Sequence, residues 1–185
     1  MTEFNKENAI KWIIGQLDAT SKWLIEEHES HNGVWTSDFL DSLMHPMELI
    51  GENGAVCPFR KSKESRQTEA EWLYDMVWYE SDRGDFDSLT QVFMVLESEW
   101  SRYMWDVKYD FEKLLIAKAP LKVFIAEDLK DGGVIKMATA EISAFKTKEE
   151  NETYLLALYK EEELHFWRCD VKNGSCSFKE VGAKQ

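Results

Sequence analysis

The first fifty residues have the pattern of helices. Over residues 5–29, apolar side chains recur every three or four positions, as on the buried face of an amphipathic helix. Asn32 and Gly33 are expected to end this helix. The stretch 37–49, for which Ser37 could provide the cap, predicts a second and shorter helix, and a loop is expected at 51–54.

After residue 68 the pattern favours strands. Residues 71–80 are rich in aromatic and β-branched side chains and are followed by turn-forming residues at 81–84, which predicts a strand. Residues 88–100 contain a second predicted strand. Its segment 92–96 is apolar throughout, as expected for a strand that is covered on both faces.

A helix and a further strand follow. Residues 105–118 predict a helix that Pro120 ends, and 122–126 predict a short apolar strand. The apolar face of this helix consists of Val107, Phe111, Leu114 and Leu115. The order strand–helix–strand predicts a crossover connection and a parallel pair of strands.

The C-terminal part continues as helix and then strands. Residues 134–147 predict a helix, and 154–159 and 164–171 predict two strands joined by an acidic turn. Asn173 and Gly174 indicate a further turn, towards 177–181. We therefore expect an α/β fold: a mixed central β-sheet flanked by helices in residues 51–185, with an N-terminal helical segment, residues 1–50, packing on that core.

The charge balance restricts the partners. The chain has 185 residues, 35 acidic and 22 basic, which gives a formal net charge of 22 − 35 = −13. A hydrophobic content of 44% excludes a globally disordered chain. A protein whose whole surface binds nucleic acid is expected to be basic, so DNA or RNA would need a local basic patch. The densest basic run is a candidate, although it also suits a solvated loop; it comprises Arg60, Lys61, Lys63 and Arg66.

The sequence also indicates a compartment. Its first twenty residues do not resemble a signal peptide, and no run of about 18 apolar residues could span a membrane. Cys57, Cys169 and Cys176 are odd in number and lack CxxC spacing. Cys169 and Cys176 could pair across a hairpin, but free thiols are the preferred interpretation. We expect a cytoplasmic protein without a membrane partner, and a homodimer is possible if the helical segment bridges two chains.

Three carboxylates are candidates for chemistry. Glu97 and Glu99 share one face of their predicted strand, about 7 Å apart. Asp75 lies within an apolar run, where an unpaired carboxylate is costly to bury. If the two strands are neighbours, Asp75 and Glu97 could bind one hard cation such as Mg²⁺ or Mn²⁺, which would polarise a phosphoryl oxygen and activate water.

This layout resembles a known superfamily. An acidic residue on one strand, an acid-x-residue pair ending the next strand, then a helix and an apolar strand make residues 68–128 similar to PD-(D/E)XK nucleases, the restriction endonuclease-like superfamily. The resemblance implies a restriction endonuclease-like core, Mg²⁺-dependent hydrolysis of nucleic-acid phosphodiesters, and Asp75 and Glu97 as metal ligands. It also implies an early glutamate, for which Glu69 and Glu71 are candidates.

The chain departs from the family at its lysine. The family lysine lies two positions after the second acid, where this chain has Glu99. Glu99 could add a metal oxygen or act as a general base if its pKa is raised. Some members of the superfamily carry the lysine on the following helix, which nominates Lys113 or Lys108. Lys113 could instead pair with Asp110, three residues before it.

Structural interpretations of the same residues remain open. Glu97 and Glu99 could be charges that protect an edge strand, Asp75 could accept a hydrogen bond from a nearby Trp or Tyr, and Lys113 could be a solvated helix residue. The alternatives to a nuclease are a nuclease-like domain that has lost catalysis and serves as a binding or regulatory module, and an acidic protein-interaction domain.

Overall fold

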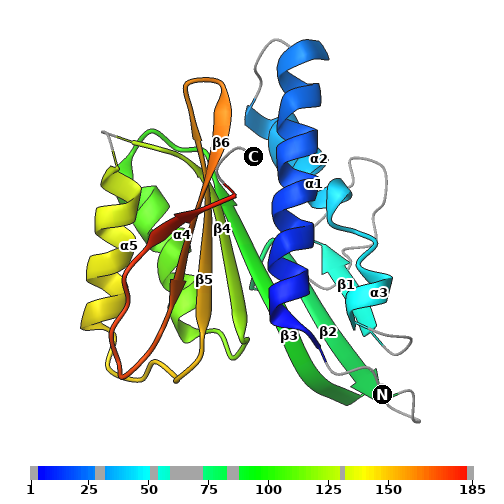
Figure 1. The fold of residues 1–185 in the computed structure, drawn as a ribbon, viewed down its shortest axis with the longest axis vertical. Helices are drawn as coiled ribbons and strands as arrows, with labels where there is room; N and C mark the ends of the chain where they lie inside the picture. Colours follow the sequence, from blue (N-terminus) through cyan, green and yellow to red (C-terminus); the bar gives the residue numbers. More distant parts are fainter. Residues whose placement is uncertain are drawn as a thin grey trace.

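The fold is taken from a computed structural model that describes residues 4–27, 32–50, 54–58, 73–82, 88–129 and 132–182. These residues form a mixed β-sheet flanked by helices, as expected (Figure 1). In chain order the elements are α1 (Lys6–Glu27), α2 (Asn32–Ser42), α3 (Met47–Ile50), β1 (Gly54–Pro58), β2 (Met76–Asp82), β3 (Ser88–Glu99), α4 (Met104–Ile116), β4 (Leu121–Glu127), α5 (Gly133–Ala144), β5 (Thr153–Lys160), β6 (Glu163–Asp170) and β7 (Lys179–Val181).

The seven described strands lie in the sheet in the same order as in the chain, β1 to β7. The pairs β1–β2, β2–β3, β5–β6 and β6–β7 are antiparallel, whereas β3–β4 and β4–β5 are parallel. Each parallel pair is connected through a helix, α4 or α5. The predicted strand–helix–strand unit with a parallel pair is therefore confirmed.

Helices cover both faces of the sheet. In Figure 1, α1 and α2 lie on one side of the sheet, and α4 and α5 lie on the other. Because side chains alternate along a strand, each strand contributes to the apolar core on both faces of the sheet: Leu96 packs in the α1–α2 layer, and Val95 packs against α4. The predicted apolar face of α4 is confirmed, because its four side chains are all buried. None of the described helices is long and apolar enough to cross a membrane.

The N-terminal helices differ from the prediction. Asn32 and Gly33 do not follow a helix end in the described chain but begin α2, which ends at Ser42. The predicted helix over 37–49 is interrupted before Pro46, because proline cannot donate a helical hydrogen bond and disfavours helical conformation in the residue before it. The Pro46 carbonyl accepts from Leu49 N at 2.7 Å, so Pro46 leads into the short helix α3.

Two strands also differ. The sequence did not predict β1, which is short and ends at Pro58. The strand predicted over 71–80 begins only at Met76 and continues to Asp82; residues 73–75 lie outside any strand, and 71 and 72 lie outside the described residues. Asp75 therefore precedes its strand, and its side chain is free of the alternation that the strand imposes.

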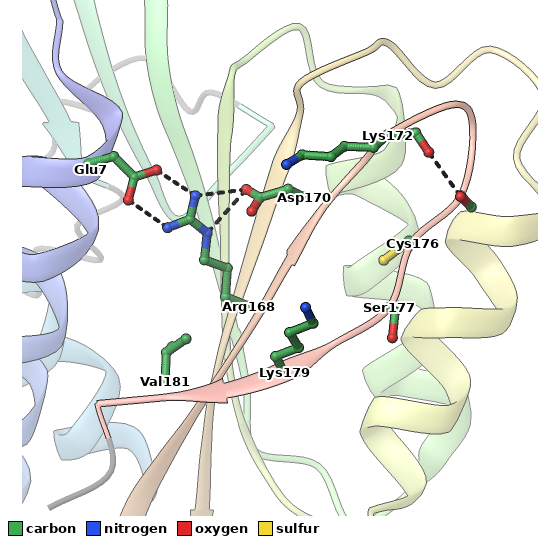
Figure 2. A pocket seen from close by; sticks show the side chains of 9 residues that line it. Glu7, Arg168, Asp170, Lys172, Cys176, Ser177, Lys179 and Val181 are labelled. Atoms are coloured by element: carbon green, nitrogen blue, oxygen red, sulfur yellow. Dashed lines mark hydrogen bonds and ion pairs between the residues drawn. The ribbon is translucent and has the colours of Figure 1, made fainter.

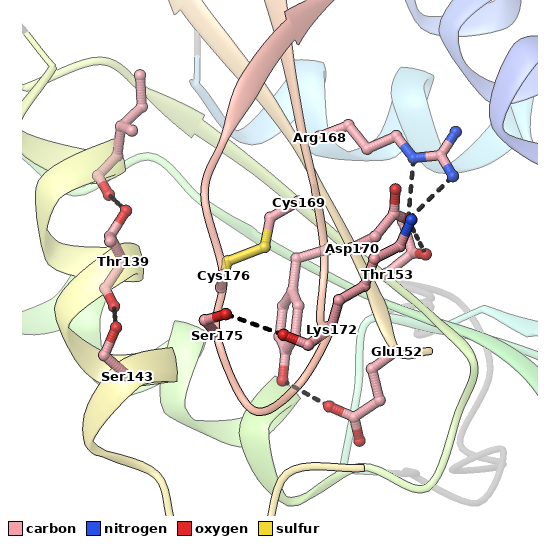
Figure 3. Close-up of a disulfide and its surroundings, with 12 residues drawn as sticks. Thr139, Ser143, Glu152, Thr153, Arg168, Cys169, Asp170, Lys172, Ser175 and Cys176 are labelled. Carbon is pink, nitrogen blue, oxygen red and sulfur yellow. Dashed lines mark hydrogen bonds and ion pairs between the residues drawn. A yellow bond between two sulfur atoms is a disulfide. The ribbon is translucent and has the colours of Figure 1, made fainter. Parts of the chain in front are cut away.

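The expectation of free thiols at Cys169 and Cys176 is wrong. The two sulfurs form a disulfide, and the Cα atoms are 5.7 Å apart (Figure 3). The predicted turn at Asn173 and Gly174 is confirmed: both residues have positive φ, 52° and 69°, as a tight hairpin turn requires. This turn reverses the chain directly after β6 and brings Cys176 back beside Cys169. The odd cysteine count gave no information about this proximity.

Candidate functional site

The candidate site lies where β3 ends. Register places Met76 opposite Leu96, so Asp75, just before β2, lies beside Glu97 of β3. The Asp75 carboxylate accepts a hydrogen bond from the backbone N–H of Ser98 at 2.8 Å. Burial raises the pKa of Asp75, and the Ser98 N–H opposes that change. The two acids predicted to act together are therefore neighbours.

Glu97 is a buried carboxyl group with unequal oxygens. Its residue is 1% exposed, and Oε2 lies 3.3 Å from the Lys113 ammonium. Its Oε1 is buried and has no hydrogen-bond partner among the described residues. Burial, followed by the charge of Asp75, raises the pKa of Glu97 to about 8, although Lys113 acts in the opposite direction. Glu97 therefore favours its protonated form, and a cation bound there would replace that proton.

Lys113, not Lys108, reaches this site. Its Nζ contacts Asp110 Oδ1 at 2.7 Å, the predicted i,i+3 pair, in addition to Glu97. Burial lowers the pKa of Lys113, but Asp110 and Glu97 together outweigh this effect, and the net shift is upward. Lys108 instead joins α4 to α5, with Nζ 2.7 Å from Glu112 and 2.6 Å from Glu141. Of the two lysines considered, only Lys113 is placed to act with the carboxylates.

Glu99 and Asp110 complete the cluster. Glu99 Oε1 accepts from the backbone N–H of Ser101 at 2.6 Å. Burial and a hydrogen bond shared with Asp110 raise the pKa of Glu99 to about 6. A carboxyl group with this pKa exchanges protons near neutral pH, as a general base or acid must. Sequence reasoning treated Asp110 only as a partner of Lys113; the signal it missed is that this helix face points at the end of β3.

The donor set suits one particular kind of metal site. Within the described ranges, no three or more His, Cys, Asp or Glu side chains are grouped closely enough to hold a metal ion together. Mg²⁺, however, commonly uses one or two carboxylates and completes its shell with water and substrate oxygens. Asp75 and Glu97 can supply two carboxylates, and the unpartnered Oε1 of Glu97 is a free oxygen ligand. The residues therefore fit a two-carboxylate Mg²⁺ site but not a site made wholly of protein ligands.

Other predicted site residues lie outside the described residues. These are the basic run, Arg60, Lys61, Lys63 and Arg66, and the alternative early glutamates, Glu69 and Glu71.

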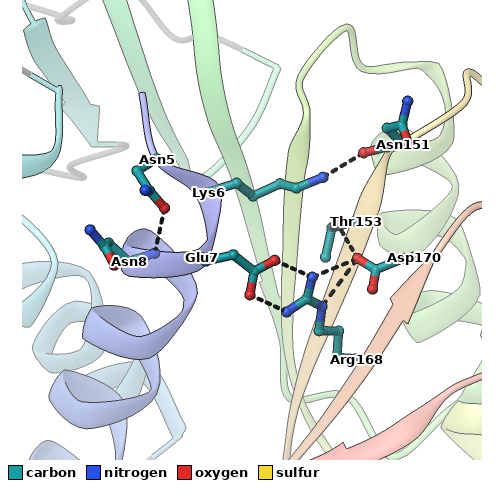
Figure 4. A network of polar contacts seen from close by, with 8 residues as sticks. All are labelled: Asn5, Lys6, Glu7, Asn8, Asn151, Thr153, Arg168 and Asp170. Carbon is teal, nitrogen blue, oxygen red and sulfur yellow. Dashed lines mark hydrogen bonds and ion pairs between the residues drawn. The ribbon is translucent and has the colours of Figure 1, made fainter. Parts of the chain in front are cut away.

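A second polar cluster joins α1 to the opposite part of the sheet. Arg168 of β6 donates to both carboxylate oxygens of Glu7, at 2.7 and 2.5 Å, and its Nε donates to Asp170 at 3.1 Å (Figures 2 and 4). The hydrogen bond from Arg168 lowers the pKa of Glu7. These residues line a hollow of about 470 Å³, together with Lys172 and Lys179. All the acids here are engaged by Arg168, so the cluster attaches the N-terminal helix.

A fully buried lysine, Lys122, has a different environment from the partly exposed Lys113. Lys122 lies at the start of β4 and is fully buried, with Nζ 2.8 Å from Glu152 and 3.2 Å from the Tyr154 hydroxyl. The Tyr154 hydroxyl in turn donates to Glu152 at 3.0 Å. Burial lowers the pKa of Lys122 and raises that of Tyr154. Because these groups satisfy one another at the opposite end of the parallel strands, we interpret them as structural.

Comparison of the chain with protein-family models, curated proteins and solved structures finds no match. The function of the protein is therefore inferred from the geometry of the site.

Proposed function

We propose that this protein is a divergent Mg²⁺-dependent nuclease that hydrolyses phosphodiester bonds in DNA or RNA. The observation that supports this most directly is the contact between Lys113 and Glu97 at 3.3 Å, beside Asp75. The resemblance to PD-(D/E)XK nucleases implies two acids and one lysine at the end of two neighbouring strands, with the lysine on the following helix in some members. In this chain, Asp75, Glu97 and Lys113 match those positions.

Each side chain has a chemically suitable task. Asp75 and Glu97 would hold Mg²⁺, which when bound supplies a Lewis acid for the phosphoryl oxygen. Lys113, kept protonated by Asp110 and Glu97, can donate to a phosphate oxygen on which negative charge develops. Glu99, with a pKa of about 6, can take a proton from an attacking water at neutral pH.

Metal binding is tested by thermal unfolding. Mg²⁺ or Mn²⁺ should raise the unfolding midpoint of the wild type, because a cation bound only by the folded state stabilises it. Asp75→Asn should abolish this increase, and Glu149→Gln, at an exposed position far along the chain, should leave it unchanged. If neither ion moves the wild-type midpoint, the metal site is contradicted.

Catalysis is tested with labelled DNA and RNA. We expect cleavage that requires Mg²⁺ or Mn²⁺ and falls by about 10²-fold or more in Glu97→Gln and Lys113→Met. Lys108→Met is the matched control, because Lys108 lies on the same helix and faces α5. If cleavage persists unchanged in Glu97→Gln, the assignment of the site is wrong.

A second candidate is a nuclease-like binding module without catalysis. It is favoured by Glu99 at the position of the family lysine and by the closer approach of Lys113 to Asp110, 2.7 Å, than to Glu97, 3.3 Å. A module of this kind would bind nucleic acid and show no metal-dependent cleavage in the same assays.

A further inference from the structure

Three large aromatic side chains extend from the start of α4 into solvent. Tyr103 and Trp105 are each 75% exposed, and Tyr109 is 63% exposed. These rings do not contribute to the packing of α4 on the sheet, because α4 packs through another face, where Val107 and Phe111 are fully buried. Exposed aromatic residues concentrated on one element indicate a binding surface.

These rings lead to the candidate site. Trp105, Tyr109 and Lys113 are four residues apart and therefore lie on successive turns of one side of α4. The Lys113 Nζ is 5.8 Å from the centre of the Tyr109 ring and 3.3 Å from Glu97 Oε2. Four residues span about 6 Å of helix axis, close to the separation at which two rings can hold one flat base between them.

The acids beside the rings are each held by a hydrogen bond or an ion pair, and one cation beside the rings is exposed. Each acid on this part of α4 has a partner at 2.7 Å: Asp106 accepts from the Ser101 hydroxyl, Asp110 pairs with Lys113, and Glu112 pairs with Lys108. Arg102 is exposed before the first ring and has no acidic partner in the described part of the chain. The surface thus presents the exposed cation Arg102 and the ring faces, and it continues through Tyr109 to Lys113, whose ammonium is ion-paired with Asp110 and Glu97.

We propose that the exposed face of α4 that carries Trp105 and Tyr109 and continues to Lys113, with Tyr103 just before the helix, binds unpaired nucleobases by stacking, so that the substrate is single-stranded nucleic acid. This inference rests on the proposed function, since it assigns the substrate class to the same site. On a chain with a net charge of −13, phosphate contacts can only be few, so stacking has to supply most of the affinity. A duplex hides its base faces and offers these rings no equivalent contact.

Binding is measured by fluorescence anisotropy in EDTA, where no metal-dependent cleavage occurs. The probes are a labelled oligothymidine, an abasic strand of the same length and charge, and a duplex. We expect the oligothymidine to bind at least tenfold more tightly than either of the others. Equal affinity for the abasic strand overturns the proposal, because it assigns the binding to phosphates.

Variants test the rings directly. Trp105→Ala and Tyr109→Ala should each weaken oligothymidine binding about fivefold or more, and Trp105→Phe should retain most of it. Ile116→Ala is the control, because Ile116 is 62% exposed on the same helix and has no ring. Unchanged affinity in both alanine variants overturns the proposal. The proposal is also overturned if the protein binds a lysine- and arginine-rich peptide but not the oligothymidine, and if Trp105→Ala abolishes the binding of that peptide.

Two further results separate this inference from the proposed function. Stacking-dependent binding together with absence of metal-dependent cleavage supports the inference and contradicts the nuclease. Cleavage that Glu97→Gln abolishes, but that is equal on single strands and duplexes and unaffected by Trp105→Ala, supports the nuclease and overturns the inference.

Discussion

Glu97 combines three conditions that separately shift a carboxyl pKa: burial, a neighbouring acid and a neighbouring cation. Burial and Asp75 dominate, and the resulting value of about 8 means that the metal-free folded protein keeps Glu97 largely protonated at neutral pH. The folded state therefore binds a proton that the unfolded state has released above its ordinary pKa of 4.5. In this window, stability falls as pH rises.

The first prediction follows from this sign. In EDTA, the free energy of unfolding of the wild type should fall between about pH 5 and pH 8 by more than that of Glu97→Gln, because each pKa unit corresponds to about 1.4 kcal/mol. Urea unfolding at several pH values measures the difference. Glu149→Gln should retain the wild-type slope, and an identical slope in Glu97→Gln would show that Glu97 does not titrate in this range.

The buried group of Lys122, Glu152 and Tyr154 gives a second prediction. Glu152→Leu should destabilise the protein by about 3 kcal/mol, because it leaves the Lys122 ammonium buried without its counter-charge. Adding Lys122→Met to this variant should recover most of the loss. Chemical unfolding measures both changes. Lys160→Met serves as the control, because the Lys160 side chain is only partly buried and lies 3.7 Å from the exposed Glu161. If Glu152→Leu destabilised the protein as little as Lys160→Met does, the buried-pair interpretation would be contradicted.

At the scale of elements, the sequence was most informative where one element buries a continuous apolar pattern. The apolar run 92–96 predicted β3, the four-residue apolar face predicted α4, and the apolar run 122–126 predicted β4, whose parallel pairing follows from the order strand–helix–strand. The sequence was least informative where an element is short or where its boundary depends on tertiary contacts. The strand β1 has only five residues, and α2 and α3 are separated at Pro46.

The candidate site shows the same division. Alternation places Glu97 and Glu99 on one face, and the family resemblance nominates Lys113 or Lys108. The involvement of Asp110, however, depends on how α4 sits against the end of β3. Residue spacing in the sequence does not determine how α4 is oriented on the sheet. The hydrogen bond between Glu99 and Asp110 could therefore be identified only from the structure.

Packing of α3 against β1 supports a prediction about two glycines. A Cβ atom at Gly54 would lie 2.3 Å from Ile50 Cγ1, so Gly54→Ala should destabilise the protein by about 1–3 kcal/mol through overpacking. Gly15→Ala is the matched control: a Cβ there meets nothing within 4 Å, and alanine in a helix should stabilise by about 0.5–1 kcal/mol. Thermal unfolding compares the two. A neutral Gly54→Ala would show that Ile50 adjusts at little cost.

At the scale of the whole molecule, the net charge of −13 opposes folding through self-repulsion. Raising NaCl from low concentration to about 0.1 M, where the screening length is about 10 Å, should therefore raise the unfolding midpoint. Replacing two exposed acids, Glu149→Lys and Glu162→Lys, should raise the midpoint at low salt and reduce the further gain from NaCl. An unchanged midpoint in the wild type would mean that the charges are already balanced locally.

The order of the strands has a consequence for the growing chain on the ribosome. Each strand pairs with the strand synthesised just before it, so the sheet can be extended one strand at a time. The helix α1 is synthesised before the sheet, yet it packs against β5 and β6, and Glu7 meets Arg168 only after β6 has been made. The buried face of α1, which includes Ile13 and Leu17, therefore lacks its contacts with β5 and β6 until these strands have been made. In the nascent protein, α1 can pack on α2 early, but its contacts with β5 and β6 form late, so part of its apolar face needs protection by a chaperone until then.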